Sequence, residues 1–341
     1  MSADLAWEAY AERVAALGFS VRREDDPPLI ASRPVTRVRP DLWKGKLIEQ
    51  LVQEAGRVVA GGGATGSERR TLRLKNSGLP YGTTQTLWAG VQYVNPGEHA
   101  RPHRHTPNAL RYVLRGQGSV TVVDGATYAL GDGDFVLTPA NSWHEHENRG
   151  SEPCYWLDCL DIPLVRALEV EFFENFPKPR QPEVMPAAPR AQHLVGHLWP
   201  AAPAPGAEPL LAYPAAEAYA ALASLGAWAP DPEDGWLIEY VRPGGGHVLR
   251  TMACYLQALP GGFAGRAHRH THSTLYYVAE GRGRTVVDGL ELEWEAGDFF
   301  VVPSWSSHAH HTSSSAGRAV LFSVTDRPVF EALGLWRGQA E

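Results

Sequence analysis

The sequence is poor in several features, and each shortage argues against a class of protein. It contains three cysteines, and none of them has the Cys-x-x-Cys spacing of a metal or redox site. No apolar run reaches the ~18 residues that a membrane span requires, and the first residues lack the basic-then-apolar order of a signal peptide. The net charge of −7 offers no basic face for nucleic acid. We therefore predict a cytoplasmic protein that binds neither nucleic acid nor membrane.

Helical patterning is confined to a few stretches of the chain. Apolar residues at helical spacing predict helices near residues 1–20, 46–58 and 215–225. From about Thr71 onward, short β-rich runs alternate with Gly, Asp, Asn and Pro, a pattern typical of an all-β protein. Residues 177–214 are rich in Pro and Ala and are predicted to form a linker.

An internal repeat decides the predicted fold. The run PHRHTPNALRYVLRGQGSVTVVDG, followed by GDFVLTP and WHEHEN, recurs as AHRHTHSTLYYVAEGRGRTVVDG, GDFFVVP and SHAHHT. The histidines that correspond are His103 with His268, His105 with His270, and His144 with His308. A tandem duplication of this kind predicts two similar jelly-roll β-barrels with a few peripheral helices. We place the domains at residues 1–190 and 191–341.

Three histidines in each copy have the spacing of a metal site. His103 and His105 lie two residues apart on a predicted strand, so their side chains point to the same face, and His144 follows a later strand. Three imidazoles leave three positions open on a six-coordinate Fe(II), enough for a chelating substrate and O₂. Hydrogen-bonded structural histidines are the alternative. In the second copy, the histidines form either a degenerate structural site or a second metal site.

This spacing resembles that of the cupin superfamily, whose first motif runs Gly-x5-His-x-His-x3-Glu-x6-Gly. Ala109 stands where that motif has Glu, and Thr274 replaces it in the second copy. The missing Glu disfavours a four-ligand manganese site of the oxalate-processing kind, and also a zinc sugar-phosphate isomerase. The motif positions that are present in the first copy are Gly97, His103, His105, Gly116, Gly133, Pro139, His144 and Asn148.

The first copy also resembles the gentisate 1,2-dioxygenase family. The resemblance rests on the first repeat together with ERRTLRLKNSG and TLWAGVQYVNPGEHA upstream and WLDCLDIPLV downstream. It implies an Fe(II)-dependent ring-cleaving dioxygenase, with one Fe(II) per chain in the first barrel. The enzyme would insert O₂ between the carboxyl-bearing and hydroxyl-bearing carbons of gentisate. The family also suggests a homo-oligomer, in the form of a tetramer.

Other substrates, and a protein of a different class, are alternatives to this predicted function. Family relatives act on salicylates and on 1-hydroxy-2-naphthoate, so salicylate, a 5-substituted salicylate and 1-hydroxy-2-naphthoate are alternative substrates. Gly90 leaves room for such a range, because a larger residue there would narrow the wall of the site. A non-enzymatic metal- or ligand-binding bicupin is the alternative of a different class. Such proteins generally lose the histidine triads, whereas both are present here.

The resemblance further implies a set of residues around the metal. The catalytic set is Arg111, His146 and Asp158, and the substrate contacts are Gln92, Trp88, Gly90, Arg69 and Arg70. Arg111 would bind or polarise the substrate, and His146 and Asp158 would handle the hydroxyl proton.

Each of these residues also has a plain structural interpretation. Arg111 could form a surface ion pair, Asp158 could cap a turn, and Gln92 could satisfy backbone groups. Strand alternation favours the functional interpretation of Arg111, because it is in phase with His105 and so is predicted to face inward. In the second copy Tyr276 replaces Arg111 and no WLDCLD-like segment follows. We therefore expect turnover to belong to the first barrel.

Overall fold

The computed structural model describes residues 3–23, 25–26, 28–59, 70–182, 211–242 and 245–341. They form two compact units, Met1–Val35 and Thr36–Glu341. The first unit contains helix α1 (Ala3–Ala16), which lies within the helix predicted at residues 1–20. The domain boundary near residue 190 and most of the predicted linker lie outside the described residues. Among the helices described, none has the length and apolar character needed to cross a bilayer.

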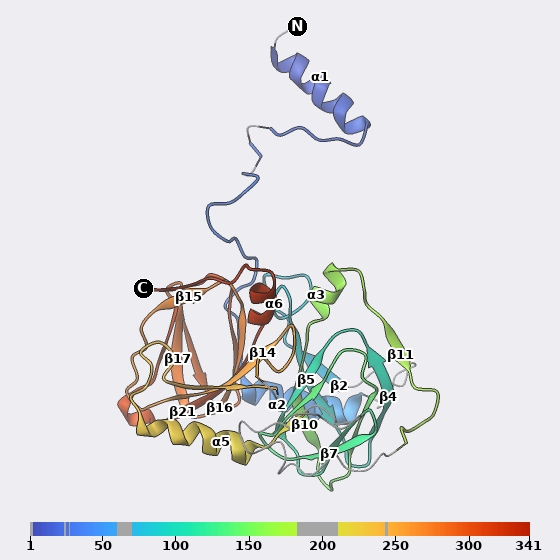
Figure 1. Cartoon of the computed structure of the whole chain (residues 1–341), viewed down its shortest axis with the longest axis vertical. Helices are drawn as coiled ribbons and strands as arrows, with labels where there is room; N and C mark the ends of the chain where they lie inside the picture. Colours follow the sequence, from blue (N-terminus) through green and yellow to red (C-terminus); the bar gives the residue numbers. More distant parts are fainter. Residues whose placement is uncertain (1–2, 24, 27, 60–69, 183–210, 243–244) are drawn as a thin grey trace. The chain divides into compact units, whose positions relative to one another are not determined.

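The second unit contains two β-barrels, each made of two facing sheets, and Figure 1 shows them beside one another. Barrel one has the sheet orders β12-β8-β5-β10-β3-β2 and β11-β4-β9-β6-β7. Its strands are β2 (Arg70–Arg73), β3 (Trp88–Val94), β4 (His99–His105), β5 (Ala109–Arg115), β6 (Ser119–Val123), β7 (Ala126–Leu130), β8 (Phe135–Thr138), β9 (His144–Asn148), β10 (Cys154–Leu160), β11 (Phe173–Asn175) and β12 (Ala212–Tyr213).

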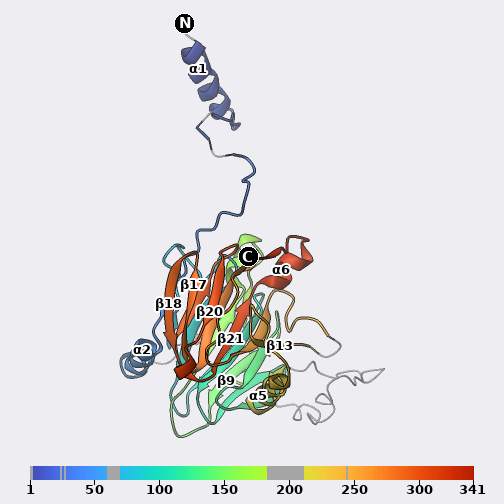
Figure 2. The ribbon, with the colours of Figure 1, turned by 90° about the vertical axis from the view of Figure 1, so that its left-hand side faces the viewer.

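Barrel two repeats this arrangement, with the sheet orders β1-β19-β16-β21-β14-β13 and β18-β17-β20-β15-β22. Figure 2 shows β18, β17 and β20 side by side in the second of these sheets. Its strands are β1 (Leu42–Trp43), β13 (Trp236–Tyr240), β14 (Ala253–Leu259), β15 (His268–His270), β16 (Thr274–Glu280), β17 (Arg282–Val287), β18 (Leu290–Glu295), β19 (Phe299–Val302), β20 (His308–His311), β21 (Ala319–Thr325) and β22 (Gly338–Ala340).

Short helices lie outside the barrels, as the sequence predicts. Two of them match the expected stretches near residues 46–58 and 215–225. The helices of this unit are α2 (Gly45–Val58), α3 (Ile162–Ala167), α5 (Ala215–Ser224) and α6 (Arg327–Ala332), with the 3₁₀ turns η1 (Leu225–Ala227) and η2 (Ser314–Ala316).

The repeated Val-Asp-Gly sequence forms the same hairpin turn in both barrels. In barrel one, Asp124 and Gly125 adopt φ values of 47° and 87° between β6 and β7. Asp288 and Gly289 adopt 47° and 86° between β17 and β18. Two-residue turns with both central φ values positive match the twist of the flanking strands and favour Asp-Gly or Asn-Gly. The turn fixes the register of these strands, and with it the face on which each side chain lies.

The barrels exchange edge strands. β1, which precedes barrel one in the chain, pairs with β19 of barrel two, and β12, which follows the linker, pairs with β8 of barrel one. The helix after each exchanged strand is capped by the barrel that receives the strand. Asp298 accepts a hydrogen bond from the Gly45 amide at 2.8 Å, and Asp134 accepts one from the Ala215 amide at 2.8 Å. The two predicted domains are thus interlocked through these strands.

The largest hydrophobic core of the unit runs from one barrel into the other. Tyr112 of β5 stacks on Phe322 of β21 with ring centroids 4.1 Å apart, and Phe135 lies 5.0 Å from Tyr240. The barrel sheets that carry these aromatic side chains therefore have little solvent between them. A separate core lies around Tyr276, Phe300 and Trp294 in barrel two.

Buried carboxylates at the starts of α3 and α6 add polar contacts between the barrels. Asp161 accepts hydrogen bonds from Asn108 at 2.9 Å and from Thr251 at 2.5 Å. Asp326 accepts one from the Ser273 amide at 2.8 Å and another from the Thr86 hydroxyl. Burial raises the pKa of Asp326 to about 6, against the effect of these hydrogen bonds.

The raised pKa of Asp326 predicts a pH-dependent free energy of unfolding. An unfolded Asp takes up its proton near pH 3.9, so between about pH 4 and pH 6 the folded chain binds more proton than the unfolded chain. The contribution of protonated Asp326 to the free energy of unfolding is therefore greatest below that window. It decreases as the pH rises through the window, by roughly 2 kcal/mol between pH 4 and pH 7. Asp326→Asn is expected to remove this contribution. The free energy of unfolding of the variant should therefore increase relative to that of the wild type as the pH rises. Urea unfolding of both proteins from pH 4 to pH 7 checks this, and a difference that stays constant with pH would contradict it.

Candidate active site

The three histidines of the first repeat come together inside barrel one. His103 and His105 lie on β4, and the half-buried Arg104 between them is paired with Glu174 at 2.7 Å. His144, on the adjacent strand β9, is the direct register partner of His103. The ligand nitrogens of the three histidines lie within 4.8 Å of one another. Strand alternation and strand pairing therefore create the triad that the sequence predicts.

Backbone carbonyl groups fix the orientation of all three imidazole rings. Because a carbonyl oxygen only accepts, each Nδ1 must carry the proton, and Nε2 is the nitrogen left to act as a ligand. Such bonds orient metal-binding histidines in many proteins. The bonds run from His103 Nδ1 to the Arg101 oxygen at 2.9 Å, from His105 Nδ1 to the Pro107 oxygen at 2.7 Å, and from His144 Nδ1 to the Ser142 oxygen at 2.9 Å.

The triad has the properties of a divalent transition-metal site. His144 is fully buried, and its Nε2 has no hydrogen-bond partner among the described residues. Burial, followed by the neighbouring His103 and His105 rings and then by Arg111, holds the pKa of His144 well below its ordinary value. The ring is therefore neutral near pH 7, which is the form that binds metal. Three imidazoles facing one point form a donor set that fits such an ion.

A buried ion pair lies beside the triad. Arg111 on β5 is 2 % exposed, and its Nε lies 2.8 Å from Oδ1 of Asp158, the residue opposite it on β10. A second nitrogen of the guanidinium donates to the Thr138 hydroxyl at 3.0 Å. Arg111 is therefore not part of a surface ion pair. The N-cap residue of α3 is Asp161, so Asp158 does not have the role of capping that helix.

His146 lies on the same strand as His144, two residues further along. It is fully buried, its Nδ1 lies 2.9 Å from the Thr121 hydroxyl, and its ring is 5.5 Å from that of His144. Trp156 of β10 packs against it at 5.8 Å. The ring therefore lies close to the triad, in an orientation fixed by Thr121.

The predicted substrate contacts on β3 lie beside β10, the strand that carries Asp158. Gly90 pairs in register with Asp158, and Gln92 pairs with Trp156. A Cβ atom on Gly90 would lie 2.7 Å from a Thr71 methyl group and 3.3 Å from the Trp88 ring. Gly90 therefore determines how close these two side chains come to the strand, rather than simply leaving open space.

Two arginines are predicted to contact the substrate carboxylate, and the structure describes one of them. Arg69 lies outside the described residues. Arg70 is buried, but its guanidinium pairs with Glu98 at 2.5 Å and donates to the Val59 carbonyl at 2.7 Å. Its charge is already compensated by Glu98, so we leave Arg70 out of the substrate contacts that we propose.

Some residues near the triad were missed by the sequence analysis. Phe173 of β11 stacks on His103, with ring centroids 5.3 Å apart and planes inclined at 25°. Thr121 and Thr138 orient His146 and Arg111. Trp156 could have been found, because it is in phase with Asp158 on the same strand. Phe173 gave no such signal, since it lies outside both repeats and reaches the triad only through the pairing of β11 with β4.

Comparisons with known proteins agree with this geometry. The model of the cupin domain family matches residues 90–160 and 255–325, one match in each barrel. A gentisate 1,2-dioxygenase from Aquipseudomonas alcaligenes is 34% identical, and the alignment covers 91% of this chain and 89% of that protein. The 5-aminosalicylate 1,2-dioxygenase of Comamonas sp. is 38% identical over 91% of this chain and 84% of its own length.

The chain belongs to the gentisate 1,2-dioxygenase family. Members of this family are bicupins, and the fold agrees with that of a solved one. A crystal structure of salicylate 1,2-dioxygenase from Pseudoaminobacter salicylatoxidans, with gentisate adducts, superposes with a TM-score of 0.84 at 31% identity, covering 100% of this chain and 94% of that one. The predicted family, the bicupin fold and the ring-cleaving dioxygenase activity are thereby confirmed. The family and the histidine triads together indicate that the protein binds metal.

Proposed function

We propose that barrel one binds Fe(II) on His103, His105 and His144, and that this chain cleaves gentisate between the carboxyl-bearing and hydroxyl-bearing carbons. The observation that carries the proposal is the triad, with two of its histidines buried and its three Nδ1 atoms bonded to carbonyls, next to a buried guanidinium. A ferrous ion bound there would anchor the substrate carboxylate and ortho hydroxyl and supply electrons to O₂. The relatives named above act on 2-hydroxybenzoates, which all carry this chelating pair.

Arg111 is the group that we propose to bind the substrate anion. A guanidinium has five N–H donors in a planar fork, and the contacts with Asp158 and Thr138 use Nε and Nη1. Nη2 can then donate to the substrate carboxylate or to the negative charge that develops on the ring, which is worth most in a buried setting. Asp158 holds Arg111 in place and is thus a positioning residue for it.

His146 is the residue that we propose to exchange the hydroxyl proton. Its Nδ1 is bonded to Thr121, so exchange with the substrate would use Nε2 on the opposite side of the ring. Histidine is the side chain that most often acts as a general acid or base in enzymes. Gln92 and Trp88 complete the proposed substrate contacts from β3.

The test is anaerobic Fe(II) reconstitution followed by oxygen-uptake measurements. Gentisate, salicylate, 5-aminosalicylate and 1-hydroxy-2-naphthoate are compared, with 3-hydroxybenzoate as the matched control because its hydroxyl is not ortho to the carboxylate. We expect the highest kcat/KM with gentisate and no uptake with 3-hydroxybenzoate. Faster turnover of another 2-hydroxybenzoate would replace gentisate as the substrate, and no uptake with any of them would contradict the proposal.

Gly90 provides a test of substrate range. Gly90→Ala adds a methyl group that must push against Thr71 and the Trp88 ring, so the wall of the site should shift inward. A mismatch of one methyl group typically changes specificity by about 10–200-fold. We expect kcat/KM for 1-hydroxy-2-naphthoate, relative to gentisate, to fall by about tenfold. An unchanged ratio would show that Gly90 does not shape the substrate wall.

We also propose that the protein is a cytoplasmic homo-oligomer, and specifically a tetramer. Three buried, unpaired thiols suit a reducing compartment. Apolar side chains are exposed along 168–173 and 333–336, which is typical of surfaces that associate. Light scattering coupled to size-exclusion chromatography measures the assembly directly.

A further inference from the structure

The histidine triad of barrel two has the same shape as that of barrel one. Its ligand nitrogens also lie within 4.8 Å of one another. The ring of His308 lies 4.2 Å from that of His268 and 4.9 Å from that of His270. The corresponding distances in barrel one are 4.3 and 4.8 Å. A copy that only filled space would have no physical reason to hold three imidazoles around one point at these distances.

The second triad is also oriented in the same way as the first. Each Nδ1 lies near the carbonyl two residues away, and the buried His308 Nε2 has no hydrogen-bond partner among the described residues. Buried polar atoms without partners are rare in proteins and call for a ligand or another explanation. The Nδ1-to-oxygen distances are 3.4 Å from His268 to Arg266, 2.9 Å from His270 to His272, and 3.1 Å from His308 to Ser306.

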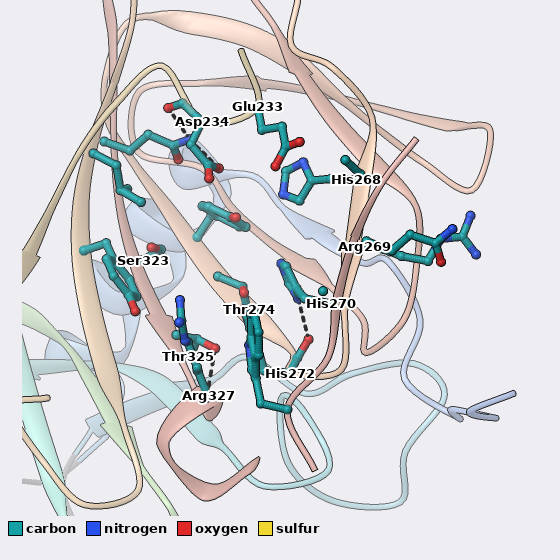
Figure 3. A pocket seen from close by; sticks show the side chains of 18 residues that line it. Glu233, Asp234, His268, Arg269, His270, His272, Thr274, Ser323, Thr325 and Arg327 are labelled. Atoms are coloured by element: carbon teal, nitrogen blue, oxygen red, sulfur yellow. Dashed lines mark hydrogen bonds between the residues drawn. The ribbon is translucent and has the colours of Figure 1, made fainter. Parts of the chain in front are cut away.

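His268 and His270 of this triad line a pocket of about 350 Å³ (Figure 3). The carboxylates of Glu233 and Asp234 lie at the end of the pocket where His268 is found. The arginines that line the pocket are each paired with a carboxylate: Arg269 with Glu341, and Arg327 with Glu331 at 2.6 Å. Glu233 is likewise paired with Arg266 at 2.6 Å. The cationic groups that line the pocket are therefore compensated and do not oppose the binding of a metal ion.

The anion-binding pair of barrel one is absent from barrel two. Tyr276 occupies the register position of Arg111, and Ser323, opposite it on β21, occupies that of Asp158. The Tyr276 ring stacks on Phe300 at 4.7 Å, and Phe300 is parallel to Trp294 at 6.1 Å. The interior beside the second triad is therefore aromatic and uncharged where barrel one has a guanidinium.

We propose that barrel two binds a second divalent transition-metal ion on His268, His270 and His308, in a pocket that does not accept the aromatic acid. Imidazole ligands suit Fe(II), Co(II) and related ions of the first transition series. The metal site follows from the second triad alone. Only the exclusion of the aromatic acid rests on the function proposed for barrel one, because it compares the two pockets.

Metal counting tests the site without any activity measurement. Wild type, His103→Ala, His268→Ala and the double variant are loaded anaerobically with Fe(II) alone, desalted and analysed by mass spectrometry for iron per chain. We expect about two, one, one and none, respectively, by the ligand assignment. His247→Ala serves as the control, because His247 belongs to neither triad and pairs with Glu239 and Glu331, and it should keep two. One iron in wild type and in His268→Ala would overturn the proposal. Circular dichroism checks folding, and His308→Gln provides a second variant of the same site.

Cobalt absorption then tests the selectivity of the two pockets. Co(II) is loaded into His103→Ala, which keeps only the second site, and into His268→Ala, which keeps only the first, and gentisate is added to each. The visible bands should shift in His268→Ala and stay unchanged in His103→Ala. A shift in His103→Ala would overturn the proposed exclusion. If neither variant responds, the function proposed for barrel one fails, whereas two metals per chain would still support the second site.

Discussion

Replacing His144 with alanine is expected to lower the rate of ring cleavage by at least about 10³-fold, which corresponds to about 4 kcal/mol of lost transition-state stabilisation. His144 is fully buried between His103 and His105, and no other side chain at this point of barrel one is proposed as a ligand. Two imidazoles would hold Fe(II) weakly, and the substrate would lose its anchor. Oxygen uptake with gentisate after Fe(II) loading measures the effect.

Two further alanine variants serve as comparisons for His144→Ala. His247→Ala, which changes a histidine paired with Glu239 and Glu331, should keep the wild-type rate and controls for the loss of any histidine. His308→Ala removes the corresponding ligand from barrel two. Because barrel two lacks the guanidinium, we expect this variant to retain most of the rate. A loss as large as that in His144→Ala would contradict the assignment of turnover to barrel one.

Replacing Arg111 with methionine is expected to reduce both activity and stability. Loss of a buried donor to developing negative charge typically costs about 10²–10³-fold in kcat. The same change leaves Asp158 buried without its cation, and breaking a buried ion pair from one side costs about 3–5 kcal/mol. Oxygen uptake with gentisate measures the first effect, and urea unfolding of the metal-free protein measures the second.

A double variant separates the two effects of Arg111. Arg111→Met combined with Asp158→Asn removes both charges, so it should be more stable than Arg111→Met alone while remaining equally inactive. Arg318→Met is the control for stability, because Arg318 pairs with Glu280 on the surface at 3.1 Å and exposed pairs contribute only about 0–1 kcal/mol. Full activity in either Arg111 variant would rule out the proposed anion contact.

The triads and the barrels could be predicted because they depend on short-range rules. Strand alternation places His103 and His105 on one face, and the Asp-Gly turns set the register of the strands that follow. The same parity places Arg111 toward the interior. Because the two repeats align histidine by histidine, the triad predicted for the first barrel could also be predicted for the second from the same spacing.

Contacts made across large sequence separations could not be predicted in this way. Nothing in the local pattern indicates that Arg70 pairs with Glu98 or that Phe173 stacks on His103. The exchange of β1 and β12 was missed for the same reason, since two-residue strands have almost no periodicity of their own. A boundary placed by composition at residue 190 therefore separates β12 from the sheet that it completes.

The exchanged strands have a consequence for the thermodynamics of the whole Thr36–Glu341 unit. Each barrel depends on the other for an edge strand and for half of the stacked pair formed by Tyr112 and Phe322. The loss of order in one barrel removes contacts from the other, so the unit behaves as one cooperative body on heating or in denaturant. Any ligand that binds only the folded form of one barrel then raises the melting temperature of both.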